Sequence, residues 1–170
     1  DDKDYLDGRG KQYYQNFIVN ESRERQWALA RLAGYGFDDS TYIWNESPGY
    51  SVNVVNEFAD LANRLDRDAG VNLFDSIPVL QKAVMASAQY LMPNRMICGF
   101  GDTHPNYLKP LGAESVMSYA KRRNLSGLYC RYDSLARALS PDASAVSIER
   151  YVSPSFYSAN VSWLAMRSGM

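Results

Sequence analysis

The segment from Trp44 to Tyr50 places side chains with acid, amide and aromatic chemistry close together. It reads WNESPGY and stands directly before an amphipathic run. Pro48 and Gly49 predict a turn that leads into a helix. At the start of a helix, free backbone N–H groups and the positive end of the helix dipole favour anions. A phenol in this position would have its anionic form stabilised, so Tyr50 is a candidate general acid or base.

Residues 93–110 form a second region with side chains that could serve a site. They contain three prolines and two glycines and show little periodicity, which predicts an irregular connection. Connections of this length without regular structure are often functional. Asp102 and His104 both lie within it. The structural alternative is an Asx turn for Asp102 and an ordinary loop position for His104.

Composition limits the classes of function and of site. The chain has 170 residues and is 46% hydrophobic, which is sufficient for the core of one domain. A net charge of −1 provides no field that would draw the chain to nucleic acid or a membrane. Two cysteines make neither a disulfide framework nor a zinc site, and a single histidine excludes a histidine-based metal cluster within this chain.

Arginine outnumbers lysine 13 to 5. Guanidinium groups suit the bidentate recognition of carboxylate and sulfate. Solvated helix faces are the plainer explanation of the same arginines. No apolar run approaches the length that spans a membrane. The chain starts at Asp1 without an initiator methionine, and we expect it to be an excerpt of a longer protein.

The spacing of apolar residues predicts a series of helices that is followed by strands. Ser76 and Pro78 resemble a helix cap with proline in the first turn. The expected helices cover residues 11–34, where Gly34 ends the run, 51–67, 76–92, 112–123 and 126–139. After Pro141 the pattern changes, and strands are expected around Ile148 and Tyr151 and across Val161, Trp163 and Ala165.

These elements predict a mainly α fold built of successive helical hairpins, part of a helical toroid or solenoid. The predicted domains are residues 1–143, a partial helical domain, and residues 144–170, the start of a following β domain.

Three blocks of the sequence resemble the heparinase II/III-like polysaccharide lyases. The first is WNESPGY running into the helix that follows. The second extends from Pro93 to GFGD at residues 99–102, and the third from SPSF at residues 153–156 to Gly169. The resemblance implies an incomplete α/α toroid followed by a β-sandwich, with the active site in the canyon between them.

The resemblance also implies roles for individual residues. Tyr50 matches the catalytic tyrosine of the family, and Asn45 and Glu46 fall where polar residues face the same cleft. Asp102 lies in a loop that borders the substrate canyon. The catalytic histidines of the family lie in segments outside this window, and His104 has no counterpart among them. Trp44 is either a platform on which a sugar stacks or a core residue, and Tyr50 and Glu46 have structural alternatives as a core tyrosine and a helix-start acid.

The implied activity is β-elimination on a uronic-acid polysaccharide, such as a glycosaminoglycan, by a secreted or periplasmic enzyme. The expected partners are this acidic polysaccharide and the rest of the polypeptide, without nucleic acid or membrane. We expect no cofactor in this chain, although the following β-sandwich could hold a structural metal. We also expect the isolated chain to be inactive or nearly so, because catalysis depends on precise positioning of groups that it lacks.

Two other functions are compatible with the same residues. A glycoside hydrolase on a related α/α barrel would use Glu46 and Asp102 as its carboxylate pair. A helical module that binds carbohydrate without catalysis would use Trp44 and the arginines.

Overall fold

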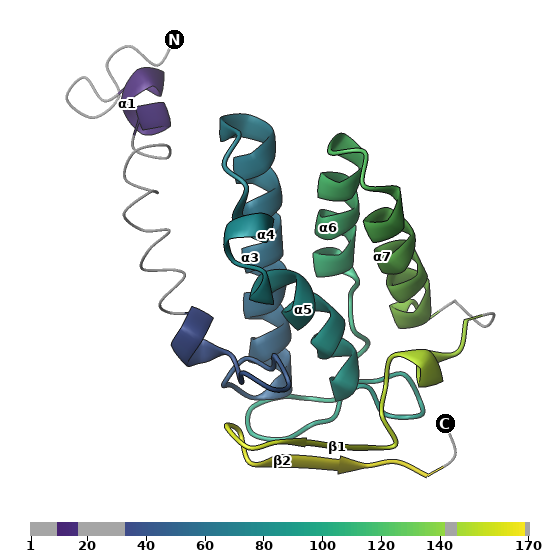
Figure 1. Cartoon of the computed structure of the whole chain (residues 1–170). Helices are drawn as coiled ribbons and strands as arrows, with labels where there is room; N and C mark the ends of the chain where they lie inside the picture. The colour runs from purple at the N-terminus through teal and green to yellow at the C-terminus, as the bar shows by residue number, and fades with distance from the viewer. Residues whose placement is uncertain (1–9, 17–32, 142–145, 169–170) are drawn as a thin grey trace.

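The chain folds into a group of helices with a small antiparallel sheet across one end (Figure 1). The computed structural model describes residues 10–16, 33–141 and 146–168. The helices are α1 (Lys11–Asn16), α3 (Pro48–Ala69), α4 (Leu73–Ser76), α5 (Val79–Ala86), α6 (Leu111–Arg122) and α7 (Ser126–Leu139). Two short 3-10 helices, η2 (Ser87–Tyr90) and η3 (Ile148–Arg150), and the strands β1 (Ser155–Ser158) and β2 (Trp163–Met166) complete the described elements. The predicted fold class, mainly α with strands at the C-terminal end, is confirmed.

Helix α3 is the longest described helix, and α4, α5, α6 and η2 pack against it. Its buried stripe recurs at helical spacing and consists of Val52, Val55, Ala59 and Ala62. The helix begins at Pro48, three residues before the predicted start, because proline has a fixed φ that suits the first turn. It ends at Gly70, which adopts a left-handed conformation with φ 66°.

Helices α6 and α7 form a hairpin that packs against α3 through α6 (Figure 1). The predicted ranges 112–123 and 126–139 agree with the observed helices to within one residue. Leu135 and Val116 are completely buried between the two helices and the rest of the core. The sequence was therefore sufficient to locate both helices.

A buried carboxylate joins the end of α3 to the end of α6. Asp66 accepts hydrogen bonds from Arg122 at 2.9 Å and from Arg123, and Arg122 also donates to the side chain of Asn63 at 2.8 Å. Burial by itself raises the pKa of the Asp66 carboxyl, but the two guanidinium groups outweigh it, so this pKa lies below its ordinary value.

Three predicted elements differ from the structure. The helix expected to open at Ser76 is wrong, because Ser76 ends α4 and the next helix begins at Val79. The earlier turn forms because the side chain of Asn72 accepts the N–H of Asp75. Residues 17–32 of the predicted helix 11–34 lie outside the described residues, and residues 33–36 are helical, so Gly34 does not end a helix.

The predicted strand around Ile148 and Tyr151 is also wrong, since η3 occupies this position. Ser147 accepts the N–H of Glu149 and starts the 3-10 turn. The strand predicted across residues 161–165 is observed as β2, which pairs with β1 so that Trp163 faces Ser158.

The two strands attach to the helices through two buried side chains. Trp163 packs against Tyr90 of η2 with ring centroids 4.9 Å apart. Arg167 donates hydrogen bonds to the carbonyl oxygens of Leu91 at 2.8 Å, Ser153 at 2.7 Å and Gln89. Burial lowers the pKa of the Arg167 guanidinium. The boundary at residues 143 and 144 stays a prediction. No helix in the described part of the chain is long and apolar enough to cross a bilayer.

We expect Asp66→Asn to lower the free energy of unfolding by about 2 kcal/mol at pH 7, because two guanidinium groups lose a charged acceptor. The folded pKa of Asp66 is depressed, so its contribution is complete above the ordinary value of 3.8 and is lost as the pH falls through the folded value. The difference between the two proteins in urea unfolding should therefore shrink below about pH 4. The control is Asp68→Asn, which removes an exposed ion pair on the same helix and should change stability little. An equal loss in both variants would contradict the role of the buried carboxylate.

Candidate functional site

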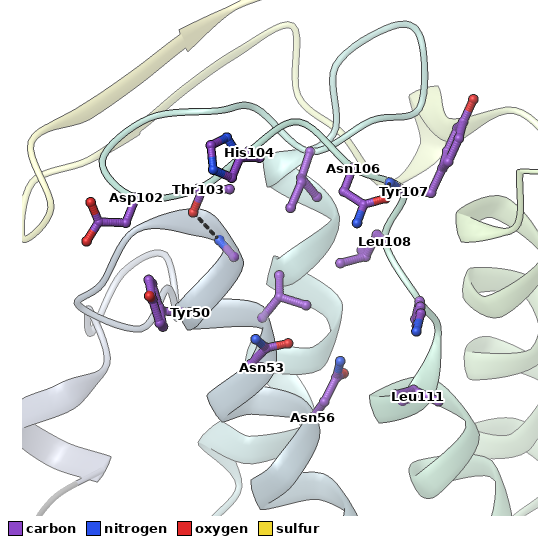
Figure 2. Close-up of a pocket in the computed structure, with 14 residues that line it drawn as sticks. Tyr50, Asn53, Asn56, Asp102, Thr103, His104, Asn106, Tyr107, Leu108 and Leu111 are labelled. Carbon is purple, nitrogen blue, oxygen red and sulfur yellow. Dashed lines mark hydrogen bonds between the residues drawn. The ribbon is translucent and has the colours of Figure 1, made fainter.

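A cavity of about 500 Å³ lies where α3 and α6 begin, beneath the connection of residues 102–109 (Figure 2). We call it the Tyr50 cavity. Its lining combines amides, phenols and a few charged groups with an apolar floor, namely Gly49, Tyr50, Val52, Asn53, Asn56, Ile97, Asp102, Thr103, His104, Asn106, Tyr107, Leu108, Lys109 and Leu111. Three of the predicted site residues, Tyr50, Asp102 and His104, are therefore brought together.

The connection is held to α3 by one buried hydroxyl. Thr103 Oγ1 accepts the N–H of Gly49 at 2.7 Å (Figure 2). The same hydroxyl donates to that of Ser47 at 3.2 Å. Ser47 occupies the cap position of α3, yet its side chain makes no cap hydrogen bond. One of the unsatisfied donors of the first turn is thus satisfied by a residue from a distant loop.

Two glycines permit this close approach. A Cβ at Gly49 would lie 3.0 Å from the hydroxyl oxygen of Thr103. A Cβ at Gly101 would lie 3.0 Å from the Cβ of Ser47, and Gly101 also has a positive φ of 60°. Larger residues at these positions would push the loop away from the helix start.

A free N–H group in the first turn of α6 also finds its hydrogen-bond partner on a distant element. The side-chain oxygen of Asn56, on α3, accepts the N–H of Gly112 at 2.9 Å. Pro110, at the cap position of α6, has no side chain that could do so. Hydrogen bonds at two helix starts therefore hold the walls of the Tyr50 cavity together. Within the connection, the N–H of Ile97 donates a hydrogen bond of 2.7 Å to the carbonyl of Asn106.

Tyr50, Asn53 and Asn56 lie on successive turns of α3 and line one wall (Figure 2). The side chain of Tyr50 is 53% exposed. Its hydroxyl forms no hydrogen bond with the described residues, so the phenol is available to a ligand. The first turn of α3 contains no acidic side chain that would oppose a negative charge there.

The opposite wall carries the charged groups. Asp102 and His104 are exposed on the loop, and Lys109 is exposed just before α6. Among the described residues of the lining, Asp102 is the single carboxylate. Such a wall offers donors to an anionic ligand from Lys109 and His104 and an acceptor for hydroxyl groups from Asp102.

The other three predicted site residues do not line the Tyr50 cavity. Trp44 packs edge-on against Phe37, with ring centroids 4.9 Å apart, and its indole N–H donates to Glu46 at 2.9 Å. The amide of Asn45 donates to the carbonyl of Tyr35 at 2.9 Å. The antiparallel bridge between Phe37 and Trp44 turns this segment toward residues 35–37. Roles for Trp44, Asn45 and Glu46 in substrate binding stay predictions.

Several lining residues were not singled out from the sequence. Asn53 and Asn56 follow Tyr50 at steps of three, and this helical spacing could have indicated a shared face. The irregular path of the connection brings four further residues to the cavity, and no periodic pattern in the sequence predicts this path. They are Thr103, Asn106, Tyr107 and Lys109.

No group of three or more His, Cys, Asp or Glu side chains in the described part of the chain is arranged to hold a metal ion. A structural metal in the following β domain stays a prediction.

Residues 40–140 match a family model that is described as the endo-acting ulvan lyase second domain. The match covers more than half of the chain and includes the whole lining of the Tyr50 cavity. No curated protein and no solved structure matches the chain. The narrower resemblance to the heparinase II/III-like enzymes stays a prediction.

Thr103→Val should detach the connection from α3, because valine has the shape of threonine without its hydroxyl. We expect a loss of about 1 to 2 kcal/mol in the free energy of unfolding and faster hydrogen exchange at the N–H of Gly49. The matched control is Thr103→Ser, which keeps the hydroxyl and should keep the protection. Unchanged exchange in the valine variant would show that this hydrogen bond does not hold the loop.

Proposed function

Because this chain belongs to the family of the endo-acting ulvan lyase second domain, we propose that its Tyr50 cavity takes part in cleaving a uronic-acid polysaccharide by β-elimination. Membership in a polysaccharide lyase family supports this general class of activity. The observation that carries the finer proposal is the half-exposed phenol of Tyr50 at the start of α3, which lines a cavity of about 500 Å³ and whose hydroxyl has no hydrogen bond to the described residues.

β-Elimination requires three kinds of catalytic group in such a site. A base removes the proton at C5 of the uronic acid, a donor protonates the leaving oxygen at C4, and a cation or amide neutralises the carboxylate. The C4–O bond breaks and a C4–C5 double bond forms. Since negative charge develops on the carboxylate in the transition state, preorganised donors near it are the main electrostatic contribution.

In our proposal, Tyr50 gives its proton to the leaving oxygen, and it acts as the base if its phenolate forms. The helix start that surrounds it favours the negative charge left behind. A histidine from outside this chain would share the proton transfers. Asp102 and His104 would contact sugar hydroxyls from the loop.

The carboxylate of the substrate would be neutralised by Asn53, Asn106 and Lys109. The amides donate hydrogen bonds without competing charge, and Lys109 is the single lysine or arginine among the described lining residues. Donors placed in this way would stabilise the enolate-like charge that develops on the carboxylate as the C5 proton leaves.

The glycoside hydrolase alternative has less support from the geometry. It needs two carboxyl groups that flank the scissile bond. Glu46, one of the predicted pair, accepts a hydrogen bond from Trp44 and does not belong to the lining, which leaves Asp102 alone among the described residues. A carbohydrate-binding module without catalysis remains the second candidate, because the exposed amides and Lys109 would bind an acidic glycan equally well.

Ulvan is the first substrate to test, because the description of the family names it. Glycosaminoglycans are the second, from the resemblance seen in the sequence. A polymer of this kind is met outside the cell, so we propose that the protein is secreted or periplasmic. We also propose that the described helices form part of an incomplete α/α toroid, and that a following β-sandwich closes the cavity.

Tyr50→Phe in the full-length protein should lower turnover of ulvan by about 10² to 10⁴-fold, because one positioned proton donor is removed. The measurement is the ultraviolet absorbance of the unsaturated uronate, which elimination creates and hydrolysis does not. Folding should be unaffected, since the side chain is 53% exposed and its hydroxyl has no partner among the described residues. Tyr107→Phe is the matched control, because Tyr107 lines the same cavity and is 50% exposed. Normal turnover by the Tyr50 variant would remove Tyr50 from the mechanism.

Lys109→Gln should lower kcat/KM by about 10 to 100-fold, because a charge-assisted contact to the substrate carboxylate is lost. Lys109→Arg keeps the charge and should retain most of the activity. A substrate whose uronic carboxylate has been reduced to an alcohol should be cleaved poorly by both forms of the enzyme. If glutamine at position 109 had no effect on kcat/KM, another group would have to neutralise the carboxylate.

A further inference from the structure

A second cavity, of about 720 Å³, lies on a different part of the surface and shares no lining residue with the first. We call it the Arg131 cavity. Helices α5 and α7, η3 and the turn at residues 40–42 form its walls. Its lining consists of Ser40, Thr41, Tyr42, Pro78, Gln81, Lys82, Met85, Ala86, Gln89, Arg131, Tyr132, Arg150, Tyr151 and Phe156.

The Arg131 cavity is cationic. Lys82, Arg131 and Arg150 all line it, and no carboxylate does so among the described residues. None of the three has an ion pair in the part of the chain that the structure describes. Other arginines behave differently, because the described ion pairs place an aspartate within 4 Å of Arg64, Arg67, Arg122, Arg123 and Arg137.

Neither of the two acids that precede the turn, Asp38 and Asp39, belongs to the lining of the cavity. Asp38 is buried and accepts hydrogen bonds from the N–H groups of Ser40 and Thr41, both at 2.9 Å, and from the hydroxyl of Ser158 at 3.3 Å. Burial by itself raises the pKa of the Asp38 carboxyl, but these bonds outweigh it and the pKa is lowered. The carboxylate of Asp38 therefore holds the turn through hydrogen bonds, and it forms no ion pair with Lys82, Arg131 or Arg150.

Aromatic rings accompany the cations. Tyr42 has a left-handed backbone with φ 61°, an uncommon conformation for a tyrosine that persists only where the surroundings enforce it. Lys82 Nζ lies 4.6 Å from the centroid of the Tyr42 ring and donates to its hydroxyl at 3.3 Å. Tyr151 and Phe156 are half-buried in the same lining. Flat aromatic faces beside cations suit a ring-shaped ligand that carries anionic groups.

The walls of the Arg131 cavity are held in place by hydrogen bonds behind the lining. The hydroxyl of Tyr132 donates to the carbonyl of Gln81 at 2.6 Å, and the amide of Gln89 donates to the carbonyl of Tyr151 at 2.9 Å. The hydroxyl of Tyr151 donates a hydrogen bond to the hydroxyl of Ser134 at 2.6 Å. A preformed wall lowers the entropy that is lost on binding.

We propose that the Arg131 cavity is a second glycan site, which binds the carboxylate or sulfate groups of an anionic oligosaccharide segment away from the Tyr50 cavity. The choice of a glycan over another polyanion rests on the proposed function, whereas the cationic and aromatic character is read from this cavity alone. One polymer that occupies both sites would gain affinity, because the second contact becomes intramolecular. Short oligosaccharides that fill only one site would gain nothing.

The test compares two triple variants of the full-length protein that remove the same charge. The first is Lys82→Gln, Arg131→Gln and Arg150→Gln. The control is Lys121→Gln, Arg67→Gln and Arg137→Gln, whose positions lie outside both cavities. Both triples are made in the Tyr50→Phe background for calorimetric binding of size-fractionated ulvan, and in the active protein for turnover. Melting temperatures check that every variant is folded.

We expect the first triple to bind long ulvan chains at least tenfold more weakly than the parent, and the control to change less than about threefold. Turnover of the shortest cleavable oligosaccharide should be unchanged in the first triple. Inorganic sulfate and uncharged dextran, as separate probes, should bind at least tenfold more weakly than an ulvan oligosaccharide.

Three results would overturn the proposal. Equal loss in both triples would assign the effect to overall charge, and unchanged binding in the first triple would remove the cavity from recognition. Sulfate that binds as tightly as the oligosaccharide would reduce the cavity to an anion site. Failure of the catalytic proposal would give a different result. Tyr50→Phe would then retain normal turnover, regardless of how strongly the two triple variants bind ulvan.

Discussion

The hydrogen bond between the N–H of Gly49 and the hydroxyl of Thr103 is the constraint on which the candidate site depends. It fixes the loop that carries Asp102 and His104 against the helix start that carries Tyr50. A Cβ at Gly49 would lie 3.0 Å from the hydroxyl oxygen of Thr103, so a larger residue there would require the loop to shift. Asn56 repeats the arrangement at the start of α6, and together the two bonds define the walls of the Tyr50 cavity.

The helices were predictable because their apolar stripes are local in sequence. Helices α6 and α7 were located to within one residue, and most of α3 lies in the predicted range 51–67. Short elements were not predictable, since a single side chain decides them. Asn72 starts α4 and Ser147 starts η3, and both contacts overrode the pattern that suggested another element.

The candidate site was predictable only in part, for the same reason. Tyr50 followed from the turn before α3, Asp102 followed from the family resemblance, and His104 was noted because it lies in the same connection. The contribution of Thr103 depends on a contact across 54 residues, and no local pattern contains it. Trp44 was grouped with Tyr50 by proximity in sequence, whereas its bridge to Phe37 directs it into an aromatic cluster.

The capping of two helices by distant residues has a consequence for how the molecule assembles. The partners are separated by 54 and 56 positions along the chain, so neither contact can form until a long loop has closed. We therefore expect the first turns of α3 and α6 to become ordered late in folding, once these loops have closed. A partly folded chain would then lack the arrangement of the Tyr50 cavity.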